Sequence, residues 1–402
     1  MGGWCELPGD LVRTIEEKLD LYQDKVKCSC VCRSWRLALP KMPHQKQHLL
    51  PWLLVPLKTK TEIGSGTSFG FFDPLDKKLH CLGLSDPHKD MLFRGSSHGW
   101  VVNLDKNNSI CLINPLTAAQ VELPPRTKFP DVANYRPNKP GREYGLRGET
   151  GPRFFTLSKD HIRKHFIQKV IVSSSPQSDE DFVAVAIYGQ FSELAYCKRG
   201  DKKWSFLDRG HWSDVIFHQG QLYAVGSDGC VMIYDIHSSH SKKTEFVPKL
   251  RERVASRFYL VKSSVGLIMV YRRIKTLQQI GVSDPDSYPI YMYKTKGFRI
   301  FKLDTTRGEW HEIQSIGDDM LFLGWNSSIS LSCKNFSQHT GNCVYFTDDN
   351  ITYHYEGIIG GFDIGIFNFT DGSIQHLPCC TTNDSELSIW PPPVWLMPNL
   401  IN

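Results

Sequence analysis

The sequence predicts an α+β multidomain protein, in which a small N-terminal helical unit precedes an all-β propeller of about six or seven blades. Two observations support this fold class. Amphipathic helical periodicity is concentrated near the N-terminus, and beyond it short runs rich in Val, Ile, Phe and Tyr alternate with turn residues. We therefore divide the chain into a helical unit (4–44), a short polar linker (45–50) and a strand-rich region (51–398).

The composition is that of a globular protein. Of the 402 residues, 41% are apolar and 22% are charged. The net charge of +5 is too small to predict a nucleic-acid partner, so we expect none. We see no signal peptide and no apolar run long enough for a membrane span, and therefore expect a cytoplasmic or nuclear protein with reduced cysteines and no membrane partner.

The first predicted helix lies in the segment LPGDLVRTIEEKL, near the N-terminus. Pro8 stands where the first helical turn favours proline. Leu11, Ile15 and Leu19 recur four residues apart, which places them on one face of a helix. This periodicity predicts that the three side chains form one apolar stripe along the helix.

The segment KVKCSCVCRSWRLALP raises the question of a metal site, because it has three cysteines at alternate positions. If the segment is one helix, Cys30 points away from a single apolar stripe that contains Cys28, Val31, Cys32 and Trp35. Zinc needs four ligands that converge in a tetrahedron, and alternate residues of a helix diverge. A buried, reduced cysteine behaves as a small hydrophobic residue. We therefore expect one helix with a cysteine-containing core face, and no metal.

A helical unit of about 40 residues buries too little apolar surface to be stable alone. Its partner is either the rest of this chain or a separate protein. The segments LPGDLVRTIEEKL and VCRSWR resemble the start and the close of an F-box. This resemblance implies docking on a Skp-type adaptor, which links the F-box to a cullin ubiquitin ligase. The adaptor-binding residues implied by the resemblance are Leu7, Pro8, Leu11, Ile15, Leu19, Val31 and Trp35.

A degenerate repeat runs through the strand-rich region. In each copy a β-rich run, a short turn and a second run with Trp, Leu or Phe follow one another. The copies are CLINPLTAAQVELPP, MIYDIHSSHSKKTEFV, FRIFKLDTTRGEWHEI and GIFNFTDGSIQHLP. Repeated hairpins of this kind predict a β-propeller, which protects its sheet edges by radial closure. An array of two-sheet sandwiches is the alternative.

Four further segments of this region resemble the KIB-type β-propeller of plant F-box proteins. They are FFDPLDKKLHCLGL, GSSHGWVV, LINPLT and IWPPPVWLMPNL. The resemblance covers roughly residues 50–400. Together with the F-box resemblance, it implies a non-catalytic receptor subunit that recruits a target protein and needs no cofactor. We read the tryptophan- and proline-rich ending as a rigid segment that closes the last blade.

The segment GSSHG has the spacing of a hydrolase nucleophile motif, with Ser97 as the nucleophile. That chemistry needs a strand, a sharp turn and a helix in succession. The residues that follow, WVVNL, indicate a strand instead. We therefore interpret GSSHG as a turn that leads into a strand.

A basic segment that begins at Arg136 contains candidate target-binding residues. We single out Arg136, Arg142 and Arg147 and expect them in a loop, because proline and glycine are frequent around them. Such a loop could be a charged rim that binds an acidic or phosphorylated partner, or simply a solvated surface.

The sequence thus predicts the substrate receptor of a ubiquitin ligase. Two alternatives stay open. One is a propeller enzyme or sugar-binding protein with a helical appendage. The other is a propeller that binds RNA or phosphoproteins and has a non-functional F-box. The sequence does not identify the target, because target choice depends on surface loops.

Overall fold

The structure of the protein is a computed structural model. The residues that it describes are 4–19, 22–39, 50–58, 67–82, 91–148, 154–177, 181–236, 243–246, 256–280, 290–304, 307–336, 338–349, 363–377 and 393–398. The predicted linker, except Leu50, lies outside the described residues, as does Trp390 of the C-terminal segment IWPPPVWLMPNL. None of the described helices has the length and hydropathy that a membrane span requires.

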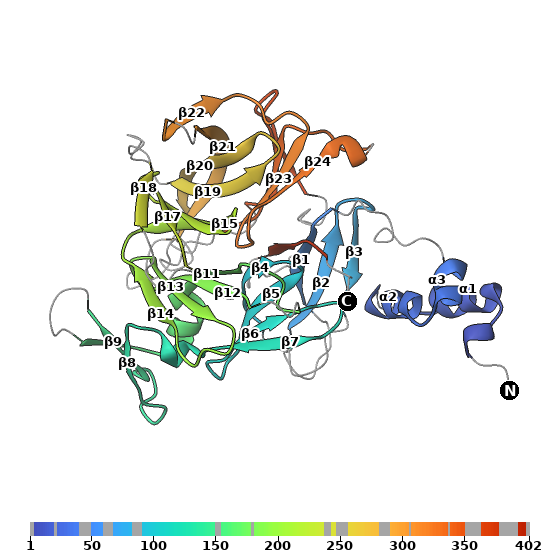
Figure 1. The fold of residues 1–402 in the computed structure, drawn as a ribbon, viewed down its shortest axis with the longest axis horizontal. Coiled ribbons are helices and arrows are strands. Elements are labelled where there is room, and N and C mark those ends of the chain that lie inside the picture. Colours follow the sequence, from blue (N-terminus) through green and yellow to red (C-terminus); the bar gives the residue numbers. More distant parts are fainter. Residues whose placement is uncertain are drawn as a thin grey trace.

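The N-terminal unit is a cluster of short helices (Figure 1). It consists of the 3-10 helix η1 (Trp4–Glu6) and the α-helices α1 (Gly9–Glu17), α2 (Tyr22–Cys30) and α3 (Arg33–Ala38). The expectation of one helix across the cysteine-rich segment is therefore wrong. The backbone of Cys32 is extended, with φ −161° and ψ 175°, and it interrupts the helix between α2 and α3.

The described strands form seven sheets, of which six have four or five strands. The sheet with the order β28-β1-β2-β3 contains β1 (Trp52–Lys58), β2 (Thr67–Asp73), β3 (Lys78–Cys81) and β28 (Val394–Leu396). The next contains β4 (Phe93–Ser97), β5 (Trp100–Leu104), β6 (Ile110–Ile113) and β7 (Gln120–Leu123). A third contains β11 (Ile167–Val172), β12 (Val183–Tyr188), β13 (Glu193–Lys198) and β14 (Ser205–Asp208).

Three more large sheets complete the set. One contains β15 (Trp212–His218), β16 (Gln221–Gly226), β17 (Val231–Tyr234) and β18 (Lys243–Phe246). Another contains β19 (Ser256–Ser263), β20 (Gly266–Ile280), β21 (Ile290–Asp304) and β22 (Glu309–Ile313). The last, with the order β24-β23-β25-β26-β27, contains β23 (Asp319–Leu323), β24 (Ile329–Ser332), β25 (Cys343–Phe346), β26 (Gly365–Asn368) and β27 (Ile374–His376). The short helix η6 (Cys333–Asn335) follows β24.

The six large sheets follow one another around a centre, which gives a propeller-like fold (Figure 1). Successive innermost strands are in contact: β28 with β4, then β11, β15, β19 and β24 in turn. The ring closes where Trp395 of β28 packs edge-on against Phe322 and Tyr345 of the last sheet. The C-terminal segment was expected to close the last blade, but its strand β28 pairs with β1 and so belongs to the first sheet, while Trp395 contacts the last sheet through its ring.

The four copies of the sequence repeat occupy equivalent places in the fold. Each forms the two outer strands of a sheet, namely β6–β7, β17–β18, β21–β22 and β26–β27. All four pairs are antiparallel hairpins, as predicted. The repeat therefore marks the outer half of a sheet, where local turn chemistry suffices to fix the pairing.

The inner strands are buried on both faces, because each sheet packs between two neighbours. All six residues of β12 and all five of β23 are buried. GSSHG lies in the same inner region: Ser97 ends β4, and β5 follows after His98 and Gly99, which have φ of 54° and 82°. The motif is therefore a tight hairpin turn, as predicted, and not a nucleophile elbow.

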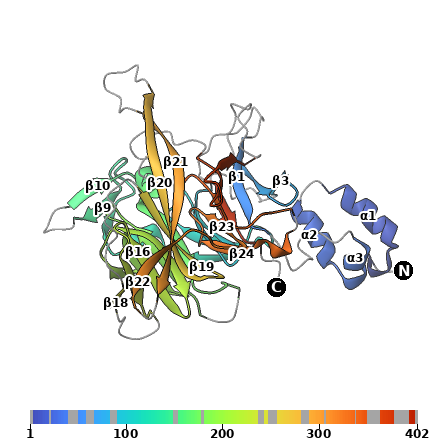
Figure 2. The same ribbon diagram turned by 90° about the horizontal axis from the view of Figure 1, so that it is seen from above.

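Two features extend beyond the ring or fill its centre. The hairpin of β20 and β21 rises out of the ring (Figure 2). The segment between β23 and β24 enters the centre, where Trp325 is fully buried with Arg94 and Arg257 over its ring at 5.0 and 4.9 Å. The Ser327 amide donates a hydrogen bond to the Ser96 carbonyl at 2.8 Å, which anchors this segment to β4.

Candidate functional site

The helical unit has a small core of its own. Its buried side chains are Val12, Cys28, Trp35 and Leu39. The Trp35 indole donates a hydrogen bond to the Trp4 carbonyl at 2.7 Å, which ties α3 to η1. Burial raises the pKa of the Cys28 thiol, as expected for a cysteine that serves as a core residue.

The apolar stripe predicted on α1 faces the core only in part, because Ile15 and Leu19 pack against the core and Leu11 does not. Val12 is 1% exposed, whereas Leu11 is 52% exposed. The reason is the position of α3, which approaches α1 so closely that a Cβ atom at Gly9 would lie 3.2 Å from the Cβ of Ala38. The contact between the two helices turns Val12 inward and Leu11 outward.

The structure divides the predicted adaptor-binding residues into two groups. Trp35 is buried in the core of the unit, and Leu7, Ile15 and Leu19 pack partly against that core. Pro8, Leu11 and Val31 are exposed. A docking partner can therefore reach the second group directly, whereas the first group holds the helices together. The adaptor-binding role of both groups stays a prediction.

Several large apolar side chains lie on the surface of this unit. Seven large hydrophobic side chains of the described residues are exposed, and four of them lie in the helical unit: Trp4, Leu11, Val31 and Leu37. Leu37 and Trp4 are the most exposed, at 76% and 71%. Exposed apolar side chains concentrated on a small unit indicate an interaction surface.

A second candidate site lies where a small sheet meets the ring. The basic segment expected to be a loop contains strands instead: β8 (Val132–Tyr135), β9 (Tyr144–Arg147) and β10 (Phe154–Leu157) form a three-stranded sheet. The 3-10 helix η4 (Arg126–Lys128) precedes this sheet. Helix α4 (Lys159–His161) and the π-helix η5 (Ile162–Phe166) connect it to β11. Tyr144 and Leu146 are buried in one core cluster with β11 and β12, so this sheet is packed rather than loose.

The three candidate arginines lie on this small sheet or next to it. Arg147 ends β9, and Arg136 and Arg142 flank the turn between β8 and β9. All three are exposed. The structure thus brings them to one edge of the molecule, but only Arg147 lines a pocket among the pockets described here.

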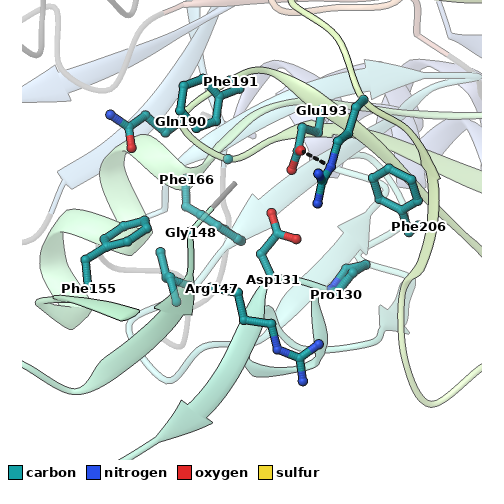
Figure 3. A pocket seen from close by; sticks show the side chains of 13 residues that line it. Pro130, Asp131, Arg147, Gly148, Phe155, Phe166, Gln190, Phe191, Glu193 and Phe206 are labelled. Carbon is teal, nitrogen blue, oxygen red and sulfur yellow. Dashed lines mark ion pairs between the residues drawn. The ribbon is translucent and has the colours of Figure 1, made fainter. Parts of the chain in front are cut away.

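That pocket has a volume of about 400 Å³ and lies between the small sheet and the sheet β11–β14 (Figure 3). Its acidic side chains are Asp131 and Glu193. Both carboxylates lie close to Gly189: a Cβ atom on that glycine would be 3.8 Å from one oxygen of each. Glu193 is paired with Arg209 at 3.4 Å. Burial raises the pKa of the neighbouring Tyr188 phenol, and the two carboxylates reinforce that shift.

Aromatic rings surround these charges. Phe155, Phe166, Phe191 and Phe206 line the pocket, and the Arg147 guanidinium points away from the two carboxylates (Figure 3). Two acidic and two basic side chains line the pocket, so its formal charges balance. Charge alone therefore does not select one class of ligand for it.

A larger groove of about 780 Å³ shares Pro130 and Phe206 with this pocket. It lies between β8 on one side and the start of β14 on the other. Its lining residues are Thr127, Lys128, Phe129, Pro130, Val132, Ala133, Asn134, Tyr135, Lys203, Trp204, Ser205 and Phe206. We call this feature the edge groove. Its only charged lining residues are Lys128 and Lys203.

Sequence reasoning missed the residues that shape this region. Lys203 belongs to a basic pair just before Trp204, which was a usable signal in the sequence. Asp131 and Glu193 gave no such signal, since they are 62 positions apart (193 − 131) and no motif links them. Their proximity depends on how the small sheet packs against the ring.

Comparison with known proteins identifies the strand-rich region. The sequence model of the KIB1-4 beta-propeller family matches residues 71–368. The chain belongs to this family. The match spans the sheets from β2 to β26, so the family propeller comprises most of the ring and the small sheet β8–β10.

Relatives of this KIB1-4 propeller protein cover nearly its whole length. F-box protein SKIP23 of Arabidopsis thaliana is 24% identical over 98% of this chain and 96% of that protein. F-box protein At2g17036 of the same plant is 23% identical over 98% of this chain and 95% of its own length. Among solved structures, a periplasmic gluconolactonase of Pseudomonas aeruginosa has a TM-score of 0.28 and 12% identity, over 66% of this chain and 82% of that one. That likeness is too small to support an argument.

Proposed function

We propose that this KIB1-4 propeller protein is a non-catalytic substrate receptor of an SCF-type cullin ubiquitin ligase. The helical unit would dock on a Skp-type adaptor, and the propeller would hold a target protein. Ubiquitin transfer would then gain its rate from proximity rather than from side chains of this chain. We further propose that the protein works in the cytoplasm or the nucleus.

One observation supports this proposal above the others. Four of the seven exposed large hydrophobic side chains lie on a helical unit at the N-terminus, in a chain whose full-length relatives are named F-box proteins. A unit whose core contains four buried side chains gains stability when a partner covers such a surface. The six large sheets support a count of six blades for the propeller.

Among the residues that the structure describes, Asp214 near the centre of the ring does not support the enzyme alternative, because it is enclosed and already paired. A propeller enzyme would need accessible polar groups there. Asp214 is 1% exposed, forms an ion pair with Lys169 and accepts a hydrogen bond from the Leu260 amide at 2.9 Å. Ser328 of the segment between β23 and β24 donates its hydroxyl hydrogen bond to Asp214 at 3.3 Å.

Co-purification with a Skp-type adaptor tests the proposal. Leu11→Asp places a charge on the exposed surface of α1, and because Leu11 is 52% exposed the free energy of unfolding should change by no more than about 0.5 kcal/mol. Adaptor capture should fall at least about tenfold, which corresponds to about 1.4 kcal/mol.

Leu79→Asp is the matched control. Leu79 lies on β3 and is 47% exposed, so the same substitution is made at nearly the same exposure but far from the helical unit in sequence. Its adaptor capture should equal that of the wild type. If wild type captures no adaptor, or if both variants lose it equally, the receptor proposal is wrong.

A further inference from the structure

In the part of the chain that the structure describes, the edge groove lies between two strands that each have a hydrogen-bonded neighbour on one side only. In the described part of the chain, β8 is the last strand of the order β10-β9-β8, and β14 is the last strand of β11-β12-β13-β14. All four residues of β8 line the groove, together with Ser205 and Phe206 of β14. An open strand edge offers backbone donors and acceptors to an added strand.

The groove is rigid at one end. The Trp204 amide donates a hydrogen bond to the Lys128 carbonyl at 3.1 Å, which joins the two walls there. The Trp204 indole donates to the Pro124 carbonyl at 2.8 Å, and its ring stacks on Phe129 with centroids 4.7 Å apart. Both rings are 2% exposed. Because these contacts already fix the walls of the groove, a ligand that binds there would lose little affinity to the ordering of protein side chains.

The charge of the groove is positive. Lys128 and Lys203 line it and are exposed, and no acidic residue is among its lining residues. Lys202 and Lys203 also line an adjoining pocket, and Arg136 follows β8 directly. The acidic residue of the adjoining pocket, Asp201, accepts a hydrogen bond from the Lys198 amide at 2.8 Å.

We propose that the edge groove binds an extended acidic peptide segment, which adds to β8 as a further strand. Lys128 and Lys203 would pair with its carboxylates, and Phe206, which is 45% exposed, would contact an apolar side chain of the peptide. Four residues of β8 span about 14 Å, enough to pair with about four residues of the segment. That the segment belongs to a ubiquitination target rests on the proposed function.

The lining favours a peptide over RNA. Sequence-tolerant RNA binding needs aromatic rings exposed for base stacking. Two of the four aromatic side chains in the groove, Phe129 and Trp204, are buried beneath its surface. The open edge of β8, in contrast, has backbone N–H and C=O groups at the spacing with which an extended peptide backbone can pair.

The test uses the full-length protein and labelled peptides. The probe is the fluorescein-labelled peptide Glu-Val-Glu-Val-Glu-Val, the reference is Lys-Val-Lys-Val-Lys-Val, and decauridine is the competitor. We expect the acidic peptide to bind at least about tenfold more tightly than the basic one, with an affinity that falls as salt rises. Hydrogen exchange should show new protection of the β8 amides in the complex.

Charge reversal identifies the groove. The double variant Lys128→Glu, Lys203→Glu should bind the acidic peptide at least about tenfold more weakly than the wild type. Lys296→Glu is the control, because Lys296 is exposed on β21 and lines none of the pockets described. The affinity of this control variant for the acidic peptide should stay within about twofold of that of the wild type.

Several outcomes would overturn the inference: equal affinity for the two peptides, undiminished binding by the double variant, protection elsewhere but not on β8, or tighter binding of decauridine. Adaptor capture is measured on the same proteins. Peptide binding without adaptor capture would contradict the proposed function alone, whereas adaptor capture without peptide binding would contradict this inference alone.

Discussion

The helical unit and the ring of sheets bury their side chains very differently. The core of the helical unit contains four buried residues, whereas the cluster that joins the small sheet to β11–β14 contains 22. Most exposed large hydrophobic side chains lie on the smaller unit, although the ring contains most of the residues. The helical unit therefore resembles part of an interface, and the ring resembles a complete domain.

The ring also buries several charged side chains, whereas the helical unit buries fewer. Arg94, Arg126 and Arg272 are each at most 1% exposed, whereas the described arginines of the helices are exposed or partly exposed. A buried charge is tolerated only where the surrounding fold supplies partners. The ring therefore supplies partners for most of these buried guanidinium groups from within, as for Arg94 and Arg272, whereas the helical unit exposes its arginines and much of its apolar surface.

The largest expected effect comes from the buried charge network of the ring. The Arg272 guanidinium donates to Asp349 at 3.0 Å, to Asp363 at 2.9 Å and to Thr295 at 2.8 Å. Arg272→Met would remove the cation that pairs with the Asp363 carboxylate and leave Asp349 paired with Arg257 alone, so the free energy of unfolding should fall by about 3–5 kcal/mol. Chemical denaturation measures it.

Arg299→Met is the matched control for this network. Arg299 lies on β21, the neighbour of the strand that holds Arg272, and pairs with Glu312 at 2.6 Å. Both side chains are about one-third exposed, at 30% and 34%, so the loss should stay below about 1 kcal/mol. Equal losses in the two variants would contradict the assignment of Arg272 as the buried anchor.

A smaller effect is expected in the helical unit. Trp35→Ala removes its largest buried side chain and the hydrogen bond to Trp4, and should destabilise this unit by about 3 kcal/mol. Hydrogen exchange should speed up in α1, α2 and α3 and stay unchanged in the sheets. Faster exchange throughout the ring would show that the two regions do not unfold separately.

Acidification should give the smallest effect, and it should act on the ring. Burial, together with His161 and Arg94, lowers the pKa of His165 to about 4. Burial also lowers the pKa of four other histidines of the ring: His98, His161, His218 and His339. The described residues of the helical unit contain no histidine.

The sign of the effect follows from proton binding. The unfolded chain, with a histidine pKa of about 6.5, binds protons that the folded ring excludes. The stabilising effect of His165 is therefore complete above pH of about 6.5 and is lost as the pH falls toward about 4. The melting temperature of the ring should drop between these values, and less so in His165→Gln. An identical drop in both proteins would contradict the role of His165.

The sequence alone predicted much of the fold where the determinants are local. The four repeat segments became the outer strand pairs of four sheets, because a turn and its two flanking runs are enough to form a hairpin. The Leu-Pro start of the helical unit and its cysteine-containing core were predicted as well. The family match agrees with the resemblance seen in the strand-rich region.

Which surfaces face outward depends on contacts between segments that are distant in sequence. The choice of Val12 over Leu11 as the core residue of α1 depends on α3, and the break at Cys32 separates two helices where periodicity predicted one. The edge groove joins β8 to β14, which are distant in sequence and share no hydrogen-bonded ladder. Local patterns determine which strands and helices form, because their determinants lie within a few residues. The burial of a face and the shape of a groove depend on packing between distant segments, which no local pattern encodes.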